Sequence, residues 1–216
     1  MNTLAEENYL KSIYHLALSS ENVSTNQVAS LLKTKASSVT DMIKKLADKD
    51  LINYTPYQGV SLTAAGEKIA VNIIRKHRLW EYFLVEKLNF KWYQVHEMAE
   101  EMEHISSNEL IDRLDKFMGF PKHDPHGDPI PDRNGRLKAH DLKPVSSAVE
   151  NQTVTICGVR DHSPLFLQYL EKQSLIIGKT IKVVEIIEFD RSMVLELGER
   201  KIQISREVAN NLLVAI

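Results

Sequence analysis

Histidines and carboxylates between positions 77 and 126 are the side chains best suited to chemistry in this sequence. Five of the eight histidines lie there: His77, His96, His104, His123 and His126. In a helical segment 96–104 (HEMAEEMEH), four side chains share an arc of about 100°: His96, Glu100, Glu103 and His104. Carboxylates and imidazoles beside an apolar stripe need their charge matched, and a divalent cation can match it.

A second pair, His77 and Glu81, has the i, i+4 spacing at which two helical side chains can share one ligand. The same spacing is common on solvent-facing helices that bind no metal. Taken with His126, the residues alone leave two interpretations open: a divalent-metal centre or a charged surface.

The elements that must position these side chains begin with a pattern typical of a winged helix-turn-helix. Apolar spacing predicts a helix over residues 4–19, and a capping-box pattern of Ser24 and Gln27 opens a second, short helix. A third helix has an apolar face made of Val39, Met42, Ile43 and Leu46. Two strands, 51–55 and 60–63, complete the wing.

The rest of the chain combines helices with a small β part. Thr63 caps a long helix to about Leu88, and apolar spacing predicts two more helices before residue 119. Residues 119–144 hold five of the seven prolines and predict an irregular loop. Beyond it the predicted elements are strands at 181–186, 193–197 and 201–205 and a helix capped by Ser163. The fold class is therefore mainly α with small β parts, the last of them a β-barrel.

Composition narrows the class of protein. The chain has 216 residues, of which 43% are hydrophobic and 26% charged, as in a globular protein with a core. A single cysteine, Cys157, excludes an intrachain disulfide framework and any multi-cysteine metal site. No apolar run approaches the roughly 18 residues of a membrane span, and the N-terminus lacks signal-peptide features. We therefore expect a cytoplasmic protein with no membrane contact.

The net charge of −2 conceals an asymmetry along the chain. Residues 1–78 carry three more basic than acidic side chains, whereas the remainder carries five more acidic than basic ones. A mildly basic N-terminal part permits contact with nucleic acid.

Several segments together resemble one protein family. They are ENYLKSIY (7–14), SSVTDMIKKL (37–46), GVSLTAAGE (59–67), RKHRLWE (75–81), VHEMAEEMEH (95–104) and DPHGDPIP (124–131). In this order they look like the diphtheria-toxin-repressor family of metal-dependent transcriptional regulators, and within it the manganese transport regulator branch. The resemblance extends from one end of the chain to the other.

The resemblance implies a winged helix-turn-helix DNA-binding domain at residues 1–73 and a helical metal-binding and dimerisation domain at 74–141. A linker at 142–150 leads to an SH3-like (FeoA-like) domain at 151–216. It also implies a homodimer that binds double-stranded operator DNA and represses metal-uptake genes.

Carried over residue by residue, the primary metal site uses Asn8, Glu100, Glu103 and His104. The family usually has Met or Asp in place of Asn8, whose amide oxygen adds no charge. The manganese branch has an acid in place of Lys11, so this lysine argues against a paired-metal site of that branch's kind.

A second metal site would use His77, Glu81 and His126. Further candidates for it are His96, Asp124 and Asp161, and some relatives have Cys where Asp124 stands. His96 could instead hydrogen-bond to a ligand without binding the metal.

The ligand types indicate which metal activates the protein. Glu100 stands where iron-sensing members usually have Cys, and oxygen and imidazole ligands suit Mn²⁺ and Fe²⁺ better than softer ions. We expect Mn(II) as the activating metal, with Fe(II) as the alternative. Because Asn8 belongs to the DNA-binding domain and the other ligands to the dimerisation helices, a bound metal would favour one orientation of the two.

Residues expected to meet DNA lie on the recognition helix and the wing. They are Lys35, Ala36, Ser37, Ser38, Thr40, Lys44, Tyr57 and Gln58. The small residues can approach base edges, whereas the lysines and the wing residues contact the backbone, so specificity rests partly on DNA shape.

Two other classes of function compete with this one. A His/Glu metal site with an open position could activate water in a metal-dependent hydrolase. The chain has no H-E-x-x-H segment and no evident nucleophile with a partnered base, so we expect no catalytic residues and no small organic substrate. The other alternative is a winged-helix regulator with a small organic effector and structural histidines.

Overall fold

The structure is a computed structural model that describes residues 2–18, 20, 22–55, 58–137 and 141–215. The backbone divides into two units. The first unit holds residues 1–77, 100–116 and 131–137, and the second holds 78–99, 117–130 and 138–216.

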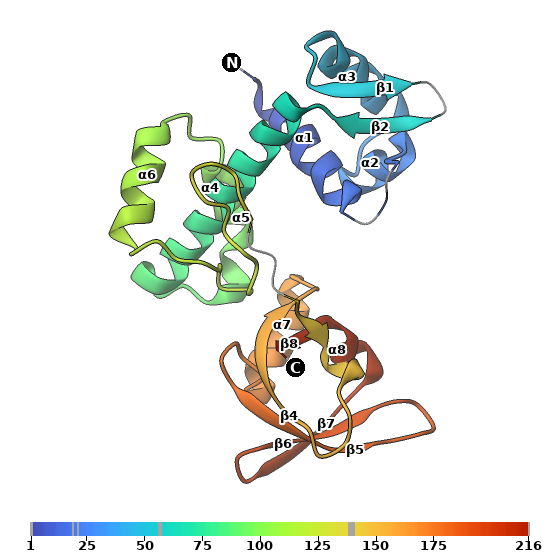
Figure 1. Cartoon of the computed structure of the whole chain (residues 1–216), viewed down its shortest axis with the longest axis vertical. Helices are drawn as coiled ribbons and strands as arrows, with labels where there is room; N and C mark the ends of the chain where they lie inside the picture. The colour runs from blue at the N-terminus through green and yellow to red at the C-terminus, as the bar shows by residue number, and fades with distance from the viewer. Residues whose placement is uncertain (1, 19, 21, 56–57, 138–140, 216) are drawn as a thin grey trace. The chain divides into compact units, whose positions relative to one another are not determined.

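Helices and a hairpin form the N-terminal part of the first unit (Figure 1). They are α1 (Leu4–Ala17), α2 (Thr25–Leu31), α3 (Ala36–Asp48), β1 (Ile52–Thr55) and β2 (Gly59–Leu62). The predicted capping box of Ser24 and Gln27 opens α2, and Thr3 with Glu6 forms another at the start of α1. Apolar side chains from these elements, among them Leu10 and Ile43, are fully buried in one core. The predicted winged helix-turn-helix is confirmed.

Gly59 shows why the wing turns where it does. Its φ is +101°, a conformation that side-chain-bearing residues rarely adopt. A Cβ at this position would also lie 2.9 Å from the carbonyl oxygen of Val23. Val60 donates its N–H to the same carbonyl at 2.9 Å, which holds the hairpin against the loop before α2.

Beyond the wing lie α4 (Ala64–Leu88), the 3₁₀ turn η1 (Trp92–Gln94), α5 (His96–Met102) and α6 (Asn108–Phe117). Thr63 caps α4 as predicted, because its hydroxyl oxygen accepts the Gly66 N–H at 3.1 Å. Helix α5 ends at Met102, so Glu103 and His104 lie in the following turn. The assumption of one continuous helix through residue 104 was therefore wrong.

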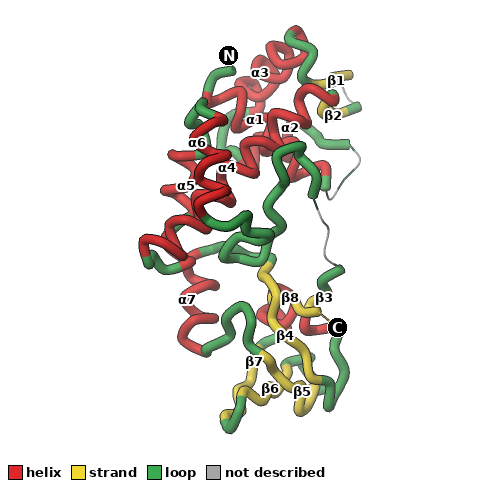
Figure 2. The backbone as a smooth tube through the Cα atoms, turned by 60° about the vertical axis from the view of Figure 1, so that its left-hand side comes forward, coloured by secondary structure: helices red, strands yellow, loops and turns green. Residues whose placement is uncertain are grey.

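The C-terminal part of the second unit is an antiparallel sheet with two helices (Figure 2). Its elements are β3 (Lys143–Pro144), η2 (Val145–Ser147), β4 (Thr153–Val159), α7 (Pro164–Gln173), β5 (Thr180–Ile186), β6 (Met193–Leu197), β7 (Arg200–Ile204), α8 (Arg206–Asn211) and β8 (Leu212–Ala215). The strand order is β3-β8-β4-β5-β6-β7. The predicted strands β5, β6 and β7 and the Ser163 cap of α7 are confirmed, whereas β3, β4, α8 and β8 were not predicted.

Two contacts tie the sheet to the helical part of the same unit. Trp92 of η1 is buried in the apolar core that the sheet covers. Val159 at the end of β4 donates its N–H to the carbonyl of His126 at 3.0 Å. Residues 117–130 are therefore held by the C-terminal sheet. Among the described helices, none has the length and apolar character needed to span a membrane.

Candidate metal centre

Glu103 is the centre of a first cluster, in the first unit. Its side chain is fully buried, and both carboxylate oxygens meet positive or potentially positive groups. Oε1 lies 2.6 Å from Lys11 Nζ, and Oε2 lies 2.7 Å from His77 Nδ1. Burial acts to raise the pKa of Glu103, but the hydrogen bond to His77 and the charge of Lys11 outweigh it and hold this pKa below its usual range.

His104 and Glu100 complete this cluster around α1. His104 Nε2 is 3.6 Å from Glu103 Oε1, and its other ring nitrogen is 2.7 Å from Glu7 Oε2. Glu100 Oε1 is 3.5 Å from Lys11 Nζ, and the Glu100 side chain is half exposed. Three of the four predicted primary ligands therefore lie near Glu7 and Lys11 of α1. The fourth, Asn8, belongs to the same helix.

Asn8, the fourth predicted ligand, is half-buried on α1. In the part of the chain that the structure describes, no hydrogen bond involves its side chain. Glu7 and Lys11, which lie beside it on α1, contact the turn after α5 instead. This turn, formed by Glu103 and His104, carries two of the predicted ligands and is called the ligand turn below. Sequence reasoning missed Glu7 and treated Lys11 only as a departure from a family pattern. No signal in the sequence places residues almost a hundred positions apart in contact.

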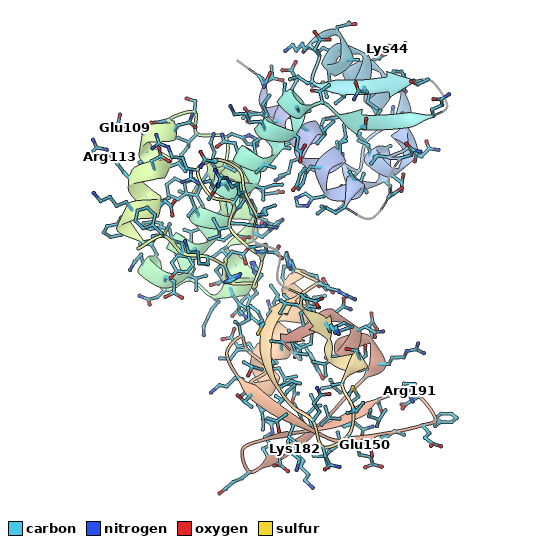
Figure 3. All side chains as sticks on the ribbon, viewed as in Figure 1. Lys44, Glu109, Arg113, Glu150, Lys182 and Arg191 are labelled. Carbon is cyan, nitrogen blue, oxygen red and sulfur yellow. The ribbon has the colours of Figure 1, made fainter. Side chains whose placement is uncertain are left out.

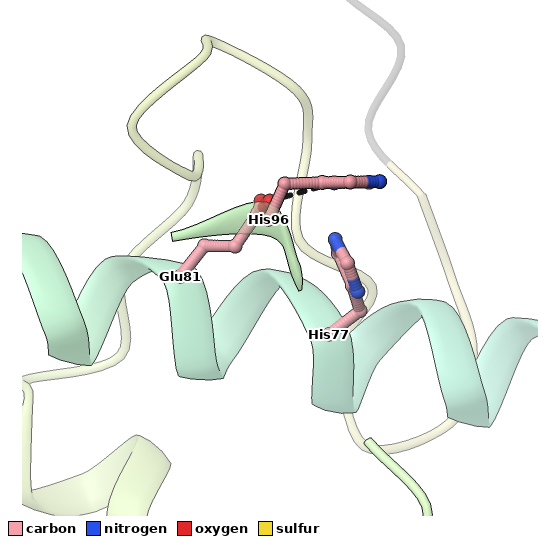
Figure 4. Close-up of side chains that lie close together, drawn as sticks. All are labelled: His77, Glu81 and His96. Carbon is pink, nitrogen blue, oxygen red and sulfur yellow. Dashed lines mark hydrogen bonds and ion pairs between the residues drawn. The ribbon is translucent and has the colours of Figure 1, made fainter. Parts of the chain in front are cut away.

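A second cluster lies in the second unit around Glu81 on α4, whose side chain is almost fully buried. Glu81 Oε1 is 3.3 Å from His96 Nδ1, and Oε2 is 3.4 Å from His126 Nδ1. Figure 4 shows the contact of Glu81 with His96 and places His77 one turn earlier on α4. Potential ligand atoms of Glu81, Asp124 and His126 all lie within 4.8 Å of one another. Four of the predicted second-site residues thus meet here, and His77, predicted with them, contacts Glu103.

Proton affinities in the second cluster are shifted by burial and by neighbouring charges. Burial, with repulsion from Asp128 and Glu81, raises the pKa of Asp124 to about 7. For His126, burial lowers the pKa, but the interaction with Glu81 outweighs it and raises the value to about 9. His126 Nε2 donates to the Trp92 carbonyl at 2.9 Å, whereas buried Nδ1 has no hydrogen bond of good geometry within the described chain. This nitrogen instead faces Glu81 Oε2 at 3.4 Å.

The C-terminal part supplies His162 to this cluster. The His162 ring stacks on that of His126 with 4.8 Å between centroids, and its Nε2 is 4.0 Å from Asp128 Oδ2. Asp161, the predicted candidate, accepts the Ser163 N–H at 2.8 Å and so helps to begin α7. Sequence reasoning missed His162, which belongs to no helical or metal-binding spacing.

The predicted DNA-contacting residues form an exposed face at the start of α3. Lys35, Ala36, Ser37, Ser38 and Lys44 are exposed, and Thr40 is half-buried with its hydroxyl donating to the Ala36 carbonyl. Figure 3 labels Lys44 on this helix. Gln58 is exposed on the wing, and Tyr57 lies outside the described residues. The described members therefore present small and basic groups outward.

Three segments of the chain match family models. Residues 1–60 match the N-terminal DNA binding domain of the iron dependent repressors, and residues 63–132 match their metal binding and dimerisation domain. Residues 143–216 match the FeoA domain.

The chain is also similar to individual proteins. An uncharacterized HTH-type transcriptional regulator of Methanocaldococcus jannaschii is 40% identical over 114 residues, which are 52% of this chain and 90% of that protein. The iron-dependent repressor IdeR of Mycobacterium leprae is 31% identical over 133 residues, 61% of this chain and 58% of IdeR. A solved manganese-dependent transcriptional repressor in complex with manganese aligns with a TM-score of 0.86 at 30% identity, over 97% of this chain and 99% of that one.

Proposed function

The chain belongs to the iron-dependent repressor family of metal-dependent transcriptional regulators, and from this premise we propose that it represses metal-uptake genes when Mn(II) binds. The observation that carries the proposal is Glu103, a fully buried carboxylate in contact with His77 and close to His104. A buried carboxylate and imidazoles gathered around one helix fit a divalent cation.

The primary ligands in this proposal are Asn8, Glu100, Glu103 and His104. When bound, the ion supplies a divalent positive charge shared between α1 and the turn after α5. Residues of the DNA-binding part and of the metal-binding part would then hold the same ion, which favours one arrangement of the recognition helix.

A second, structural site is proposed around Glu81, Asp124 and His126, with His77, His96 and Asp161 as further candidates. The convergence of potential ligand atoms of Glu81, Asp124 and His126 within 4.8 Å of one another supports it. The raised pKa of His126 reflects its contact with Glu81, and the raised pKa of Asp124 reflects its burial beside Asp128 and Glu81.

Manganese is proposed ahead of iron because the primary ligands are all oxygen or imidazole donors. Cys157, the one cysteine, lies on β4 with its thiol directed at the Thr155 carbonyl. Solved relatives include a manganese-dependent repressor, and curated relatives include an iron-dependent one, so Fe(II) is the alternative.

We propose that each domain has the role that the sequence predicts. Residues 1–73 bind operator DNA, 74–141 hold metal and dimerise, 142–150 link, and 151–216 form the SH3-like domain. The helical part exposes four apolar side chains that a second copy could cover: Leu88, Phe90, Phe117 and Phe120. The protein acts in the cytoplasm, where its DNA is.

A DNA-binding titration tests the proposal. A duplex would first be selected by the protein from a random-sequence library with MnCl₂ present, and its affinity then measured by fluorescence anisotropy in MnCl₂, in FeCl₂ under anaerobic conditions and in chelator. Binding that is strong only with metal supports the proposal. Equal binding in chelator would contradict metal control, and metal-dependent cleavage of the duplex would instead select the hydrolase alternative.

A further inference from the structure

Lys11 occupies an unusual position for a lysine. Its side chain is only 14% exposed, and its ammonium group lies against two carboxylates at once. The nitrogen is 2.6 Å from Glu103 Oε1 and 3.5 Å from Glu100 Oε1. Because the Glu103 side chain has no exposed surface and that of Lys11 has little, this contact is a largely buried ion pair.

The ammonium group lies where the proposed ligand atoms converge. Glu103 Oε1, the oxygen that it contacts, is also the oxygen nearest His104 Nε2, at 3.6 Å. Glu100 approaches the same nitrogen from the end of α5. A divalent ion held by these three side chains would have to share Glu103 Oε1 with an ammonium group, and two cations a few ångströms apart repel each other.

We propose that Lys11 is a tethered cation that occupies the primary metal position in the metal-free protein and leaves it when a divalent ion binds. The inference rests on the proposed function, because it takes Glu100, Glu103 and His104 as ligands. It adds a regulatory role: Lys11 competes with the metal and so raises the metal concentration at which the protein responds.

The ion pair also explains how the metal-free protein accommodates Glu103. Removing a cation that is in direct contact with a buried carboxylate is unfavourable, since part of the carboxylate charge is then left unmatched. Lys11 meets this need without a metal, and it holds α1 against the ligand turn. Metal binding therefore replaces the Lys11 ammonium group by a divalent ion. The metal affinity then reflects the free energy of binding the ion minus the free energy lost when Lys11 leaves Glu103.

Calorimetric titration of MnCl₂ into wild type and Lys11→Leu measures this competition. Leucine has no donor atom for the metal and cannot pair with Glu103, so Mn²⁺ affinity should rise by about ten-fold or more. Lys45→Leu is the matched control, because Lys45 also pairs with a buried carboxylate, Glu6, at 3.0 Å but lies outside the ligand cluster. Its Mn²⁺ affinity should equal that of wild type.

A second measurement uses wild type alone and is independent of whether the variant folds. Lysine acetylation with an N-hydroxysuccinimide ester, read by mass spectrometry, should modify Lys11 slowly in chelator and faster in saturating MnCl₂. Lys49, which pairs with Glu6, should react equally in both. Lys11 that stays protected in saturating MnCl₂ would overturn the inference, as would unchanged or weaker Mn²⁺ binding in a folded Lys11→Leu. Wild type that binds no divalent metal would instead defeat the proposed function, and this inference with it.

Discussion

The carboxylate of Glu103 has no contact with solvent, so its charge is matched inside the protein. Lys11, His77 and His104 surround it, and its contacts with Lys11 and His77 hold the pKa of Glu103 below its usual range, so the carboxylate stays charged. Glu103 is therefore the fixed anion of the primary cluster. In the proposed site we therefore expect Glu103 to contribute most to the binding of a divalent cation.

Glu103→Gln should weaken Mn²⁺ binding by about a hundred-fold or more, because the amide keeps the shape of the side chain and removes its charge. Lys11 loses its partner in the same variant, so circular dichroism must first establish that the protein folds. Glu109→Gln is the control, since Glu109 is an exposed carboxylate paired with Arg113 on α6. Calorimetry that gives wild-type Mn²⁺ affinity for Glu103→Gln would show that the primary site lies elsewhere.

We expect metal selectivity to depend on a different residue of the proposed site, Glu100. Its side chain is half exposed, so substitution there should leave the fold intact. Glu100→Cys supplies a softer and shorter ligand, and we expect it to lose the response to Mn²⁺ and to gain one to Fe²⁺, Co²⁺ or Zn²⁺. Glu100→Gln should weaken all these ions together. Metal-dependent DNA binding at buffered free metal concentrations measures both, and an unchanged rank order in Glu100→Cys would remove the main argument for manganese.

The sequence predicted the chemical types of the site but not all of its contacts. Glu100, Glu103 and His104 were identified from their spacing and from the family resemblance. Contacts of Glu7 and Lys11 with them depend on how α1 packs against the ligand turn, and no local pattern encodes packing between distant segments. His162 was missed for the same reason, because it reaches His126 only through the fold of the C-terminal part.

At the scale of elements, α1 connects the ligand turn to the recognition helix. Glu7 and Lys11, one turn apart, face the ligand turn. Glu6, on another side of α1, is fully buried and pairs with Lys45 and Lys49 near the end of α3, at 3.0 and 2.7 Å. A displacement of α1 at the ligands would therefore reach α3 through charged contacts as well as through the apolar core.

The Glu6 contacts should make stability depend on pH. Hydrogen bonding to Lys49, with smaller effects of Thr3 and Lys45, outweighs burial and lowers the pKa of Glu6 from 4.5 to about 2. A lowered pKa in the folded state means that the stabilisation is present above pH 4.5 and is lost as the pH falls toward 2. Glu6→Gln should therefore lower the free energy of unfolding by about 1–2 kcal/mol at pH 7.

Urea unfolding of wild type and Glu6→Gln at pH 7 and at pH 3 measures this effect. The difference between the two proteins should shrink at pH 3, because Glu6 then takes up a proton in the unfolded chain, whose pKa is 4.5, while it stays mostly ionised in the folded protein. Glu109→Gln again serves as the control and should change stability little at either pH, because its ion pair with Arg113 is exposed. An equal difference at both pH values would mean that the charge of Glu6 contributes no stability.

Helix starts were the most predictable elements, because local capping encodes them. Ser24 and Thr63 each accept a backbone N–H of the helix that they begin, whereas Ser163 precedes α7 without such a bond and the following Pro164 favours the start. The end of α5 at Met102 was not predictable, since no glycine or proline marks it and the following Glu103 is held by tertiary ion pairs. Strand β4 was missed although Val154 and Ile156 alternate inward, because a seven-residue strand with a glycine near its end gives a weak local signal.

At the scale of the whole molecule, the proposed function couples two equilibria, metal binding and DNA binding. Converting a 1:99 mixture of conformations into 99:1 requires about 10⁴-fold tighter metal binding to the favoured one. The Lys11 ion pair should reduce the extent to which metal binding shifts these conformations, because it already holds α1 to the ligand turn without metal. We therefore expect metal-free protein to keep measurable, salt-sensitive affinity for DNA, and Lys11→Leu to lower that residual affinity in chelator.

Lys44 separates the DNA contact from the metal response. It is exposed on α3, outside both ligand clusters, so Lys44→Ala should weaken DNA binding to a similar degree on every duplex and leave Mn²⁺ affinity unchanged. If Lys44 contacts a phosphate, the slope of log affinity against log salt concentration becomes shallower by about 1, because one counterion fewer is released. Anisotropy titrations at several salt concentrations, with Lys182→Ala on β5 as the control, measure that slope. A loss confined to one duplex would instead assign Lys44 to base recognition, and an unchanged slope and affinity would place the DNA contact on another face of the chain.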